Sequence, residues 1–332
     1  MKSPGTSLRK VAPGILVLFG IAVIARYLGD AIPAMTSLII AIGTGALIGN
    51  TTSVPDWIQP GLDTHKFFLQ TGIVLLGVRL TLAEIVDTGP IVAMLASVIV
   101  LFGVLYMEWI VGRLFEIKKQ TRSLLAAGAS VCGVSAVLAV SGSIEVDETD
   151  ITYAVATILL FDAVTLVVFP LVGQLLPLSG KQFGIWAGLS LFSTGPTAAV
   201  GFAFSESAGQ WATITKLVRN TFIGILAIGY AIRYTTAETD QLASSKLWGQ
   251  FPKFLFGFLV VVIFANVAGP SAQAVASIGT VRNWLFLLAF VGLGFDISLK
   301  ELRSTGIKPV LVVIVHLTTV SLITLFVVFS LF

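Results

Sequence analysis

The chain has 332 residues, of which 56% are apolar and only 11% charged, and its mean hydropathy is +0.98. Soluble domains carry roughly 25% charged residues, so this composition excludes a soluble domain and predicts an integral membrane protein. The net charge of +3 comes without a basic patch interleaved with aromatics, so a nucleic-acid partner is not expected.

The N-terminus places Lys2, Arg9 and Lys10 before an apolar stretch that has no small-residue cleavage site. We therefore expect a retained first span, with residues 1–10 in the cytoplasm. Apolar windows long enough to cross a bilayer are predicted at about 11–27, 31–49, 66–79, 89–112, 122–142, 150–172, 181–204, 211–233, 251–268, 273–295 and 309–331.

These windows predict an all-α polytopic protein with about 10–11 transmembrane helices, multi-pass in the cell (plasma or inner) membrane. A single domain over 1–332 is expected, with repeat-like halves at about 31–172 and 181–331. The basic loop 113–122 predicts a cytoplasmic position, and the acidic loop 145–150 predicts an external one. Counting from these loops puts the N-terminus inside and the C-terminus outside.

Two stretches at the ends of apolar spans are almost alike, at a constant offset of 217. Residues 77–89 are GVRLTLAEIVDTG and residues 294–306 are GFDISLKELRSTG. The predicted topology places them on opposite sides, which indicates an inverted repeat of the kind that secondary transporters use. Arg79 corresponds to Asp296, which suggests an ionic pair or two gates; sequence drift is the alternative.

Two spans are interrupted near their centres by small and polar residues. In the span 122–142 these are Gly128, Ser130, Cys132, Gly133 and Ser135. In the span 181–204 they are Ser190, Ser193, Thr194, Gly195, Pro196 and Thr197. Unwound backbone in hydrocarbon is tolerated only where it lines a cavity or packs against protein. Its freed amides attract anions and its freed carbonyls attract cations. Close helix packing through small residues is the alternative.

The same two spans also resemble each other at an offset of 60. Gly128, Ser130 and Ala139 match Gly188, Ser190 and Ala199. The predicted topology makes the two spans parallel, whereas an inverted pair needs opposite directions. Either one of them is a re-entrant hairpin or the span count is wrong by one.

Four of the ionisable residues inside predicted spans are candidates for function or for a helix break. Lys216 and Arg219 share one helix face beside Asn220, and this face could bind an anion; snorkelling to the external surface is the alternative. Asp162 is the deepest carboxylate and is predicted to be a proton or sodium site or a counter-charge, with a structural ion pair as the alternative. Arg282 is expected to mark a helix break after Gly279.

Three segments resemble one family. GASVCGVSAVLAV (128–140) resembles the G-x-S-x-C-G-x-S-A signature of an uncharacterised family of bacterial and archaeal membrane proteins named as sulfate exporters, of the YeiH or TauZ type. SESAGQWATITKLVRN (205–220) is similar to its segment leading to a K-L-x-R motif, and FVGLGFDISLKELRSTGIKP (290–309) is similar to its C-terminal glycine-rich turn. The resemblance covers about 60–310.

The resemblance implies a distant likeness to sodium/bile-acid symporters and cation/proton antiporters. It implies a panel-plus-core fold with crossed, unwound helices and export of sulfate or a similar anion. One stretch departs from the family pattern: where relatives carry a His-Asp-Thr-Ser-Gln type sequence, residues 192–199 are FSTGPTAA. The missing ionisable pair implies a different coupling or a different solute.

The function expected is secondary active transport of a small anion, with Na⁺ or H⁺ as the coupling ion and no other cofactor, metal or catalytic residue. Alternatives are a sodium-coupled carboxylate carrier, a channel, or a non-transporting membrane enzyme or scaffold. Expected partners are the anionic solute, the bilayer and, as an open alternative, a second copy in a homodimer. The predicted substrate-binding residues are Ser130, Cys132, Gly133, Ser135, Ser193, Thr194, Gly195, Thr197, Lys216 and Arg219. The predicted ion-coupling residues are Asp162, Ser190 and Asn220.

Overall fold

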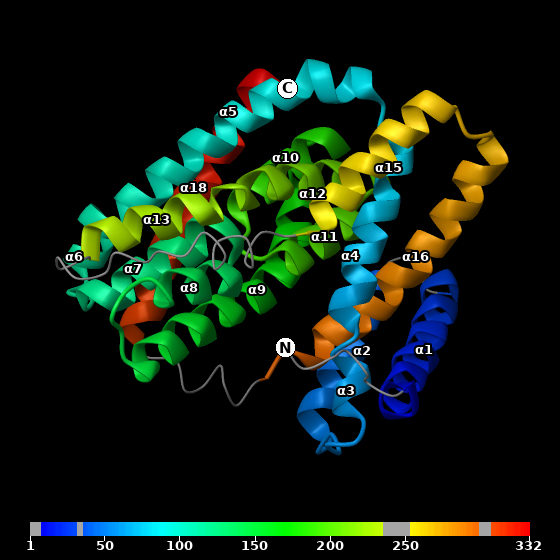
Figure 1. Ribbon diagram of the computed structural model, residues 1–332, viewed down its shortest axis with the longest axis horizontal. Helices are drawn as coiled ribbons and strands as arrows, with labels where there is room; N and C mark the ends of the chain where they lie inside the picture. The colour runs from blue at the N-terminus through cyan, green and yellow to red at the C-terminus, as the bar shows by residue number, and fades with distance from the viewer. Residues whose placement is uncertain (1–7, 32–35, 235–252, 299–306) are drawn as a thin grey trace. The chain divides into compact units, whose positions relative to one another are not determined.

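The computed structural model describes residues 8–31, 36–234, 253–298 and 307–332, and every element in these ranges is helical (Figure 1). The all-α polytopic fold is thereby confirmed. Five described helical stretches are long and apolar enough to cross a membrane: Lys10–Ala31, Ile85–Leu114, Glu148–Leu175, Ala272–Phe295 and Ile307–Leu331.

The chain divides into two compact units. Unit 1 comprises Met1–Ile85 and Lys253–Leu299, and unit 2 comprises Val86–Pro252 and Lys300–Phe332. Each unit therefore combines segments that are distant in the sequence. The single domain and its repeat-like halves stay predictions.

Unit 1 is a helical bundle in which a long helix packs against three others. Its helices are α1 (Leu8–Ala31), α2 (Ser37–Thr51), α3 (Gln59–Leu62), α4 (His65–Leu76), the 3₁₀ turn η1 (Gly77–Arg79), α15 (Phe254–Ala268) and α16 (Ala272–Phe295). Helix α16 packs against α1, α2 and α4. A Cβ at Gly294 would lie 2.9 Å from the Cα of Gly45, so small residues let α2 and α16 approach closely.

The structure corrects two predictions in unit 1. Helix α16 is continuous through Arg282, so the predicted break after Gly279 is wrong. Arg79 lies beside Gly279, whereas Asp296 follows the far end of α16 and pairs with His65 at 3.2 Å. Seventeen residues of helix, about 25 Å, separate these positions, so an ionic pair between Arg79 and Asp296 is excluded. Residues 299–306 of the second copy of the repeat lie outside the described residues.

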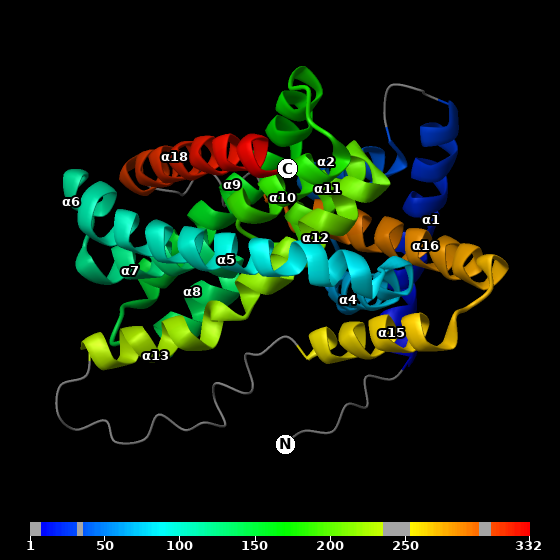
Figure 2. The same ribbon diagram turned by 90° about the horizontal axis from the view of Figure 1, so that it is seen from above.

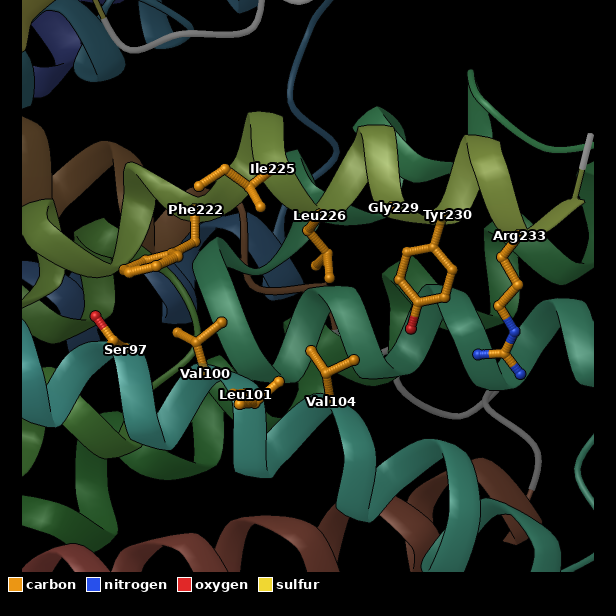
Figure 3. A pocket seen from close by; sticks show the side chains of 10 residues that line it. All are labelled: Ser97, Val100, Leu101, Val104, Phe222, Ile225, Leu226, Gly229, Tyr230 and Arg233. Atoms are coloured by element: carbon orange, nitrogen blue, oxygen red, sulfur yellow. The ribbon is translucent and has the colours of Figure 1, made fainter.

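Unit 2 holds the remaining helices. They are α5 (Leu82–Tyr106), the π turn η2 (Met107–Val111), α6 (Gly112–Leu114), α7 (Lys119–Ala127), the π turn η3 (Gly128–Cys132), α8 (Val134–Ser141), α9 (Glu148–Leu175), α10 (Gly180–Ser190), α11 (Thr194–Phe204), α12 (Glu206–Asn220), α13 (Phe222–Tyr234) and α18 (Ile307–Leu331). Helix α18 runs alongside α5 (Figures 1 and 2), and α13 faces α5 (Figure 3).

Helices α7 and α8 form a re-entrant hairpin, which we call hairpin 1 (residues 119–141). Its two ends meet, because Lys118 Nζ donates to Asp147 Oδ2 at 2.7 Å and to Asp150 Oδ2 at 2.6 Å. Its arms run back to back, since a Cβ at Gly128 would lie 2.8 Å from the Val137 side chain. The chain reverses at Gly133, whose φ of 68° suits glycine.

Helices α10 and α11 form a second hairpin, hairpin 2 (residues 180–204). The first turn of α10 lies beside the last turn of α11, because the rings of Phe183 and Phe204 stack with centroids 4.0 Å apart. The reversal occurs over residues 191–193. Pro196 is the third residue of α11, where its missing N–H has no intrahelical acceptor to lose. The break therefore precedes Gly195 and Pro196, two of the residues predicted to interrupt this span.

The two hairpins enter unit 2 from opposite ends. Helix α9, about 42 Å long, begins at the base of hairpin 1 and ends beside Phe183 at the base of hairpin 2, where Gly173 contacts that ring. The tips meet, because a Cβ at Gly133 would overlap the Ser193 hydroxyl. Each hairpin is followed by a long helical segment: α9 after hairpin 1, and α12 and α13 after hairpin 2.

The hairpins resolve the parallel-span conflict, because both interrupted spans are re-entrant. They also correct the loop orientation. A hairpin returns the chain to the end from which it entered, so loops 113–122 and 145–150 lie at the same end of unit 2, joined by Lys118 and Asp147. The side on which the N-terminus lies stays a prediction.

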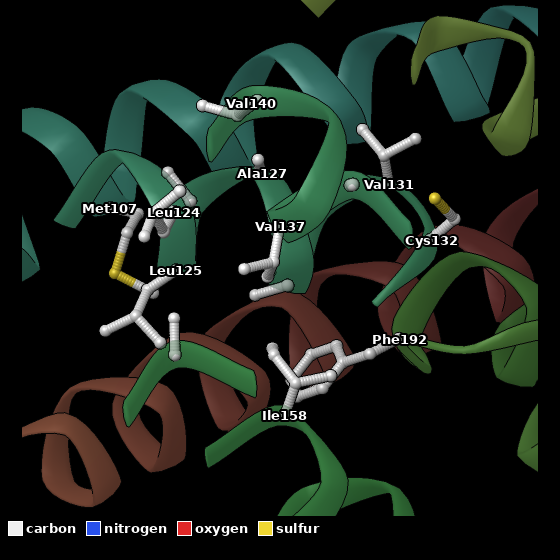
Figure 4. Close-up of a cluster of buried hydrophobic side chains, with 14 of the residues drawn as sticks. Met107, Leu124, Leu125, Ala127, Val131, Cys132, Val137, Val140, Ile158 and Phe192 are labelled. Carbon is white, nitrogen blue, oxygen red and sulfur yellow. The ribbon is translucent and has the colours of Figure 1, made fainter. Parts of the chain in front are cut away.

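Hairpin 1 is held in an apolar core. Leu124, Leu125 and Val137 of the hairpin pack with Ile158 of α9 and Phe192 of the hairpin 2 turn (Figure 4). Lipid tails are as apolar as these side chains, so the packing gains van der Waals contact rather than release from water. Close packing of these side chains therefore holds the tip of hairpin 1 in place against α9 and hairpin 2.

Candidate functional site

Lys216 of α12 lies between the two tips with a fully buried side chain. Its ammonium donates to Val131 O of hairpin 1 at 2.6 Å and to Leu191 O of hairpin 2 at 2.8 Å. Both carbonyls end the first arm of their hairpin, where a helix leaves acceptors unpaired and carries partial negative charge. A cation at this position therefore stabilises both helix ends.

Arg219, one turn further along α12, makes six hydrogen bonds to main-chain carbonyls and is also buried. Its acceptors belong to both first arms: Ala129, Ser130, Gly188, Leu189 and Leu191, at 2.7–3.2 Å. The two cations thus crosslink the hairpins through α12. Snorkelling to a surface is excluded for both.

The acceptors follow the internal repeat. Lys216 binds Val131 and Leu191, which are 60 residues apart, and Arg219 binds Ala129 and Leu189, which are also 60 apart. This is the offset at which the sequences of the two spans resemble each other. The resemblance therefore marks equivalent positions in two inverted hairpins.

Asp162 of α9 lies at the start of the second arm of hairpin 2. Its Oδ1 accepts from the backbone N–H of Ser193 at 3.2 Å, and its side chain is buried. A carboxylate suits the positive end of a helix dipole. Among the residues that the structure describes, neither Lys216 nor Arg219 forms an ion pair with Asp162. The buried cations and Asp162 are therefore held by hydrogen bonds to the backbone and not by a direct ion pair with each other.

The second arms begin with amides that no side chain caps. Neither Gly133, before α8, nor Ser193, before α11, provides a side-chain cap. The first-turn amides of these helices, from Val134 and Ser135 and from Thr194 and Gly195, lack intrahelical acceptors. Ser135 is exposed and Ser193 and Thr194 are half-buried, so this face of the tips is accessible.

Asn220, at the end of α12, joins this amide-bearing face. Its Nδ2 donates to Thr194 Oγ1 at 3.0 Å, whereas its Oδ1 is buried without a hydrogen-bond partner. A buried polar atom without a partner costs free energy. A buried oxygen that can still accept a hydrogen bond, next to the α11 amides, is a feature expected of a ligand site.

The remaining predicted residues divide into two groups. Ser130 and Cys132 lie buried at the tip of hairpin 1, and the Ser130 hydroxyl has no partner. Ser190 and Thr197 serve packing instead: Ser190 Oγ pairs with Thr324 Oγ1 at 2.8 Å, and Thr197 Oγ1 donates to Ser193 O at 2.7 Å. Both hydroxyls are thus engaged within the fold.

Sequence reasoning missed the contribution of α18. Thr324 and His316 of this helix face hairpins 2 and 1 respectively, and His316 Nε2 lies 3.2 Å from Gly103 O, close to the Ser130 hydroxyl. The available signal was polar side chains spaced along an otherwise apolar helix. Within the described ranges, no group of three or more His, Cys, Asp or Glu side chains could hold a metal ion.

Comparison with known proteins identifies the family. A family model described as Conserved hypothetical protein 698 matches residues 13–313. The chain is 31% identical to a UPF0324 membrane protein of Nitratidesulfovibrio vulgaris, covering 89% of this chain and 86% of that protein. It is 28% identical to a UPF0324 membrane protein of Clostridium tetani, covering 91% and 92%. No solved structure matches. The chain therefore belongs to the UPF0324 family of membrane proteins.

Proposed function

We propose that this protein is a secondary active transporter of a small anion. The observation that carries the proposal is the tip-to-tip meeting of two oppositely entering hairpins, whose second-arm amides are uncapped and lie beside exposed Ser135 and half-buried Ser193 and Thr194. Broken helices near the membrane midplane, with half-helix N-termini directed at an anion, are a recurring feature of secondary transporters.

The charges favour an anion over a cation at the tips. The carbonyl ends that would attract a cation already accept hydrogen bonds from Lys216 and Arg219, whereas at the amide ends Asp162 accepts only from the Ser193 N–H and the first-turn amides of α8 and α11 have no side-chain cap. Two buried cations face one buried carboxylate, Asp162, which leaves an excess of one positive charge. Such a field lowers the cost of bringing an anion out of water.

We assign Lys216 and Arg219 an indirect role in this mechanism. Both direct their donors to carbonyls, so they hold the tips and supply long-range attraction, while the amides of α8 and α11 and the hydroxyls of Ser193 and Thr194 contact the solute. Each hairpin opens toward its own end of unit 2, and alternating motion of the two tips gives alternating access to the same space.

Sulfate or a related sulfur oxyanion is the proposed solute, with export as the direction that the family resemblance implies. Backbone amides at helix N-termini bind sulfate and phosphate well. Asp162, bonded to the Ser193 amide, is the proposed site of ion coupling.

A sodium-coupled carboxylate carrier is the second candidate. It is favoured by the free Asn220 Oδ1 beside Thr194 Oγ1, since neutral oxygens of this kind are hard ligands suited to Na⁺. This candidate requires flux that follows a sodium gradient.

The test is radiolabelled sulfate flux in proteoliposomes under imposed proton or sodium gradients, with empty liposomes as the blank. Thr194→Val removes a hydroxyl of the site and should raise KM about tenfold, the effect of one hydrogen bond of ~1.4 kcal/mol. Thr221→Val is the matched control, because Thr221 is exposed and its hydroxyl bonds only to Val218 O. Folded protein that carries neither sulfate nor a panel of carboxylates under any gradient would exclude the proposal.

A further inference from the structure

An apolar groove of about 500 Å³ lies between α5 and α13 in unit 2. Val100, Leu101 and Val104 line it from α5, and Phe222, Leu226 and Tyr230 line it from α13 (Figure 3). Its size falls in the range of sites for small organic ligands.

The open side of the groove is apolar and exposed, as a surface in contact with the bilayer would be. Helix α5 lies within the apolar stretch Ile85–Leu114, which is long enough to span a membrane. Leu101 and Ile225, on the two walls, have 61% and 68% of their surface exposed. Gly229 leaves the α13 wall open, because a Cβ there would meet no atom within 4 Å. The groove therefore suits a ligand that enters from the side exposed between α5 and α13.

One end of the groove is positively charged. Arg233 lies at this end (Figure 3) and pairs with Glu108 Oε2 at 3.1 Å, while Arg122 Nε reaches the same oxygen at 3.2 Å. Lys119 Nζ lies 4.6 Å from the centre of the Tyr234 ring, the residue next to Arg233. Two arginines thus share the Glu108 carboxylate, and Lys119 adds a third positive charge nearby. The nearby carboxylates Asp147 and Asp150, at the base of hairpin 1, are paired with Lys118.

We propose that this groove binds one acyl chain of an anionic phospholipid, with the lipid phosphate at Arg233. An acyl chain fits an apolar groove open to the bilayer, and a guanidinium with 35% of its side chain exposed can take a phosphate oxygen while keeping its bond to Glu108. Basic pockets between transmembrane helices are known binding places for anionic lipid headgroups. Glu108 orients Arg233 toward this position.

Thermal unfolding of the full chain in detergent tests the proposal, with added phosphatidylglycerol compared against phosphatidylcholine of identical acyl chains. Phosphatidylglycerol should raise the Tm of the wild type by about 4 °C more than phosphatidylcholine does. Equal shifts for the two lipids would overturn the proposed headgroup recognition.

Two variants of α13 locate the site. Gly229→Phe fills the groove and should abolish the extra shift, whereas Gly224→Phe should retain it. Gly224 is the matched control because it also has no atom within 4 Å of a Cβ but does not line the groove. A full shift in folded Gly229→Phe would overturn the assignment of the groove.

Arg233 variants test the headgroup contact. Arg233→Lys should keep most of the difference between the two lipids, and Arg233→Gln should remove it. If Arg233→Gln does not fold, native mass spectrometry of lipid bound to Gly229→Phe and to Gly224→Phe decides. Retention of phosphatidylglycerol by both would exclude the groove, and its loss from Gly229→Phe alone would support it.

Discussion

The two hairpins of unit 2 reverse direction by different means. Hairpin 1 turns at a single residue, Gly133, with φ 68° and ψ −134°. Hairpin 2 turns over residues 191–193, with both Leu191 and Ser193 in extended conformations that any residue adopts. Arg219 bonds to three carbonyls of hairpin 2 but only two of hairpin 1. Because Arg219 makes three hydrogen bonds to each hairpin, side chains of α12 hold both, and hairpin 1 differs in depending also on a backbone conformation that suits glycine.

Removing the guanidinium should have the largest effect. Arg219→Met leaves carbonyls of both first arms buried without donors, which should cost about 3–5 kcal/mol of unfolding free energy. Lys216→Met should cost less, since only two bonds are lost. Denaturant unfolding in detergent measures both, and Arg113→Met, at an exposed arginine, is the control. Equal stability of the Arg219 and Arg113 variants would contradict the crosslinking role.

Gly133→Ala should destabilise the protein by about 2–4 kcal/mol, because alanine is strained at this φ and its Cβ would overlap the Ser193 hydroxyl. Gly142→Ala, where the nearest atom lies 3.6 Å from the Cβ, should cost little and is the control. The double variant with Ser193→Ala separates the causes. If the clash with the Ser193 hydroxyl contributes in addition to the backbone strain, the double variant should be about 1 kcal/mol more stable than Gly133→Ala alone.

Substitutions of Asp162 separate its role as a hydrogen-bond acceptor from the role of its negative charge. Asp162→Asn keeps an oxygen for the Ser193 amide and should change stability by less than about 1 kcal/mol. Asp162→Ala leaves that amide without its acceptor and should cost about 1–3 kcal/mol. Proteoliposome flux with Asp162→Asn should lose its dependence on the gradient while the fold is kept. Unchanged gradient dependence would remove Asp162 from the coupling mechanism.

The smallest effect is expected at the base of hairpin 1. The hydrogen bond from Lys118 to Asp147, and to a smaller extent the one to Asp150, raises the pKa of the lysine above its usual 10.5. The folded-state pKa is above the unfolded one, so the stabilisation is complete below pH 10.5 and is lost as the pH rises through the folded value. The Tm difference between the wild type and Lys118→Met should therefore be small at pH 8 and vanish in strong alkali. A difference that grows with pH would contradict this pairing.

Much of the helical content followed from hydropathy, but the direction of the interrupted spans did not. A window of 20 apolar residues gives the same signal whether the chain crosses the bilayer or returns, so hairpins 1 and 2 were indistinguishable from spans. The acidic loop 145–150 was misplaced for this reason. Two of its carboxylates, Asp147 and Asp150, are paired with Lys118 instead of marking the other side of the membrane.

The sequence indicated which residues belong to the site, but not which hydrogen bonds those residues make. Gly133 and the hydroxyls near 193–197 marked the broken regions, and the offset of 60 marked equivalent carbonyls. The donors that Lys216 and Arg219 direct at those carbonyls could not be predicted, because the acceptors belong to backbone 25–90 residues away. Long-range backbone contacts leave no pattern in side-chain spacing.

The position of Cys132 has a practical consequence. It is the only cysteine of the chain and lies at the tip of hairpin 1 with 6% of its surface exposed. In the proposed mechanism the tips move apart, which would expose this thiol to a reagent. The rate at which unmodified protein reacts with a membrane-permeant maleimide would then report on the opening of the hairpins, without an engineered label.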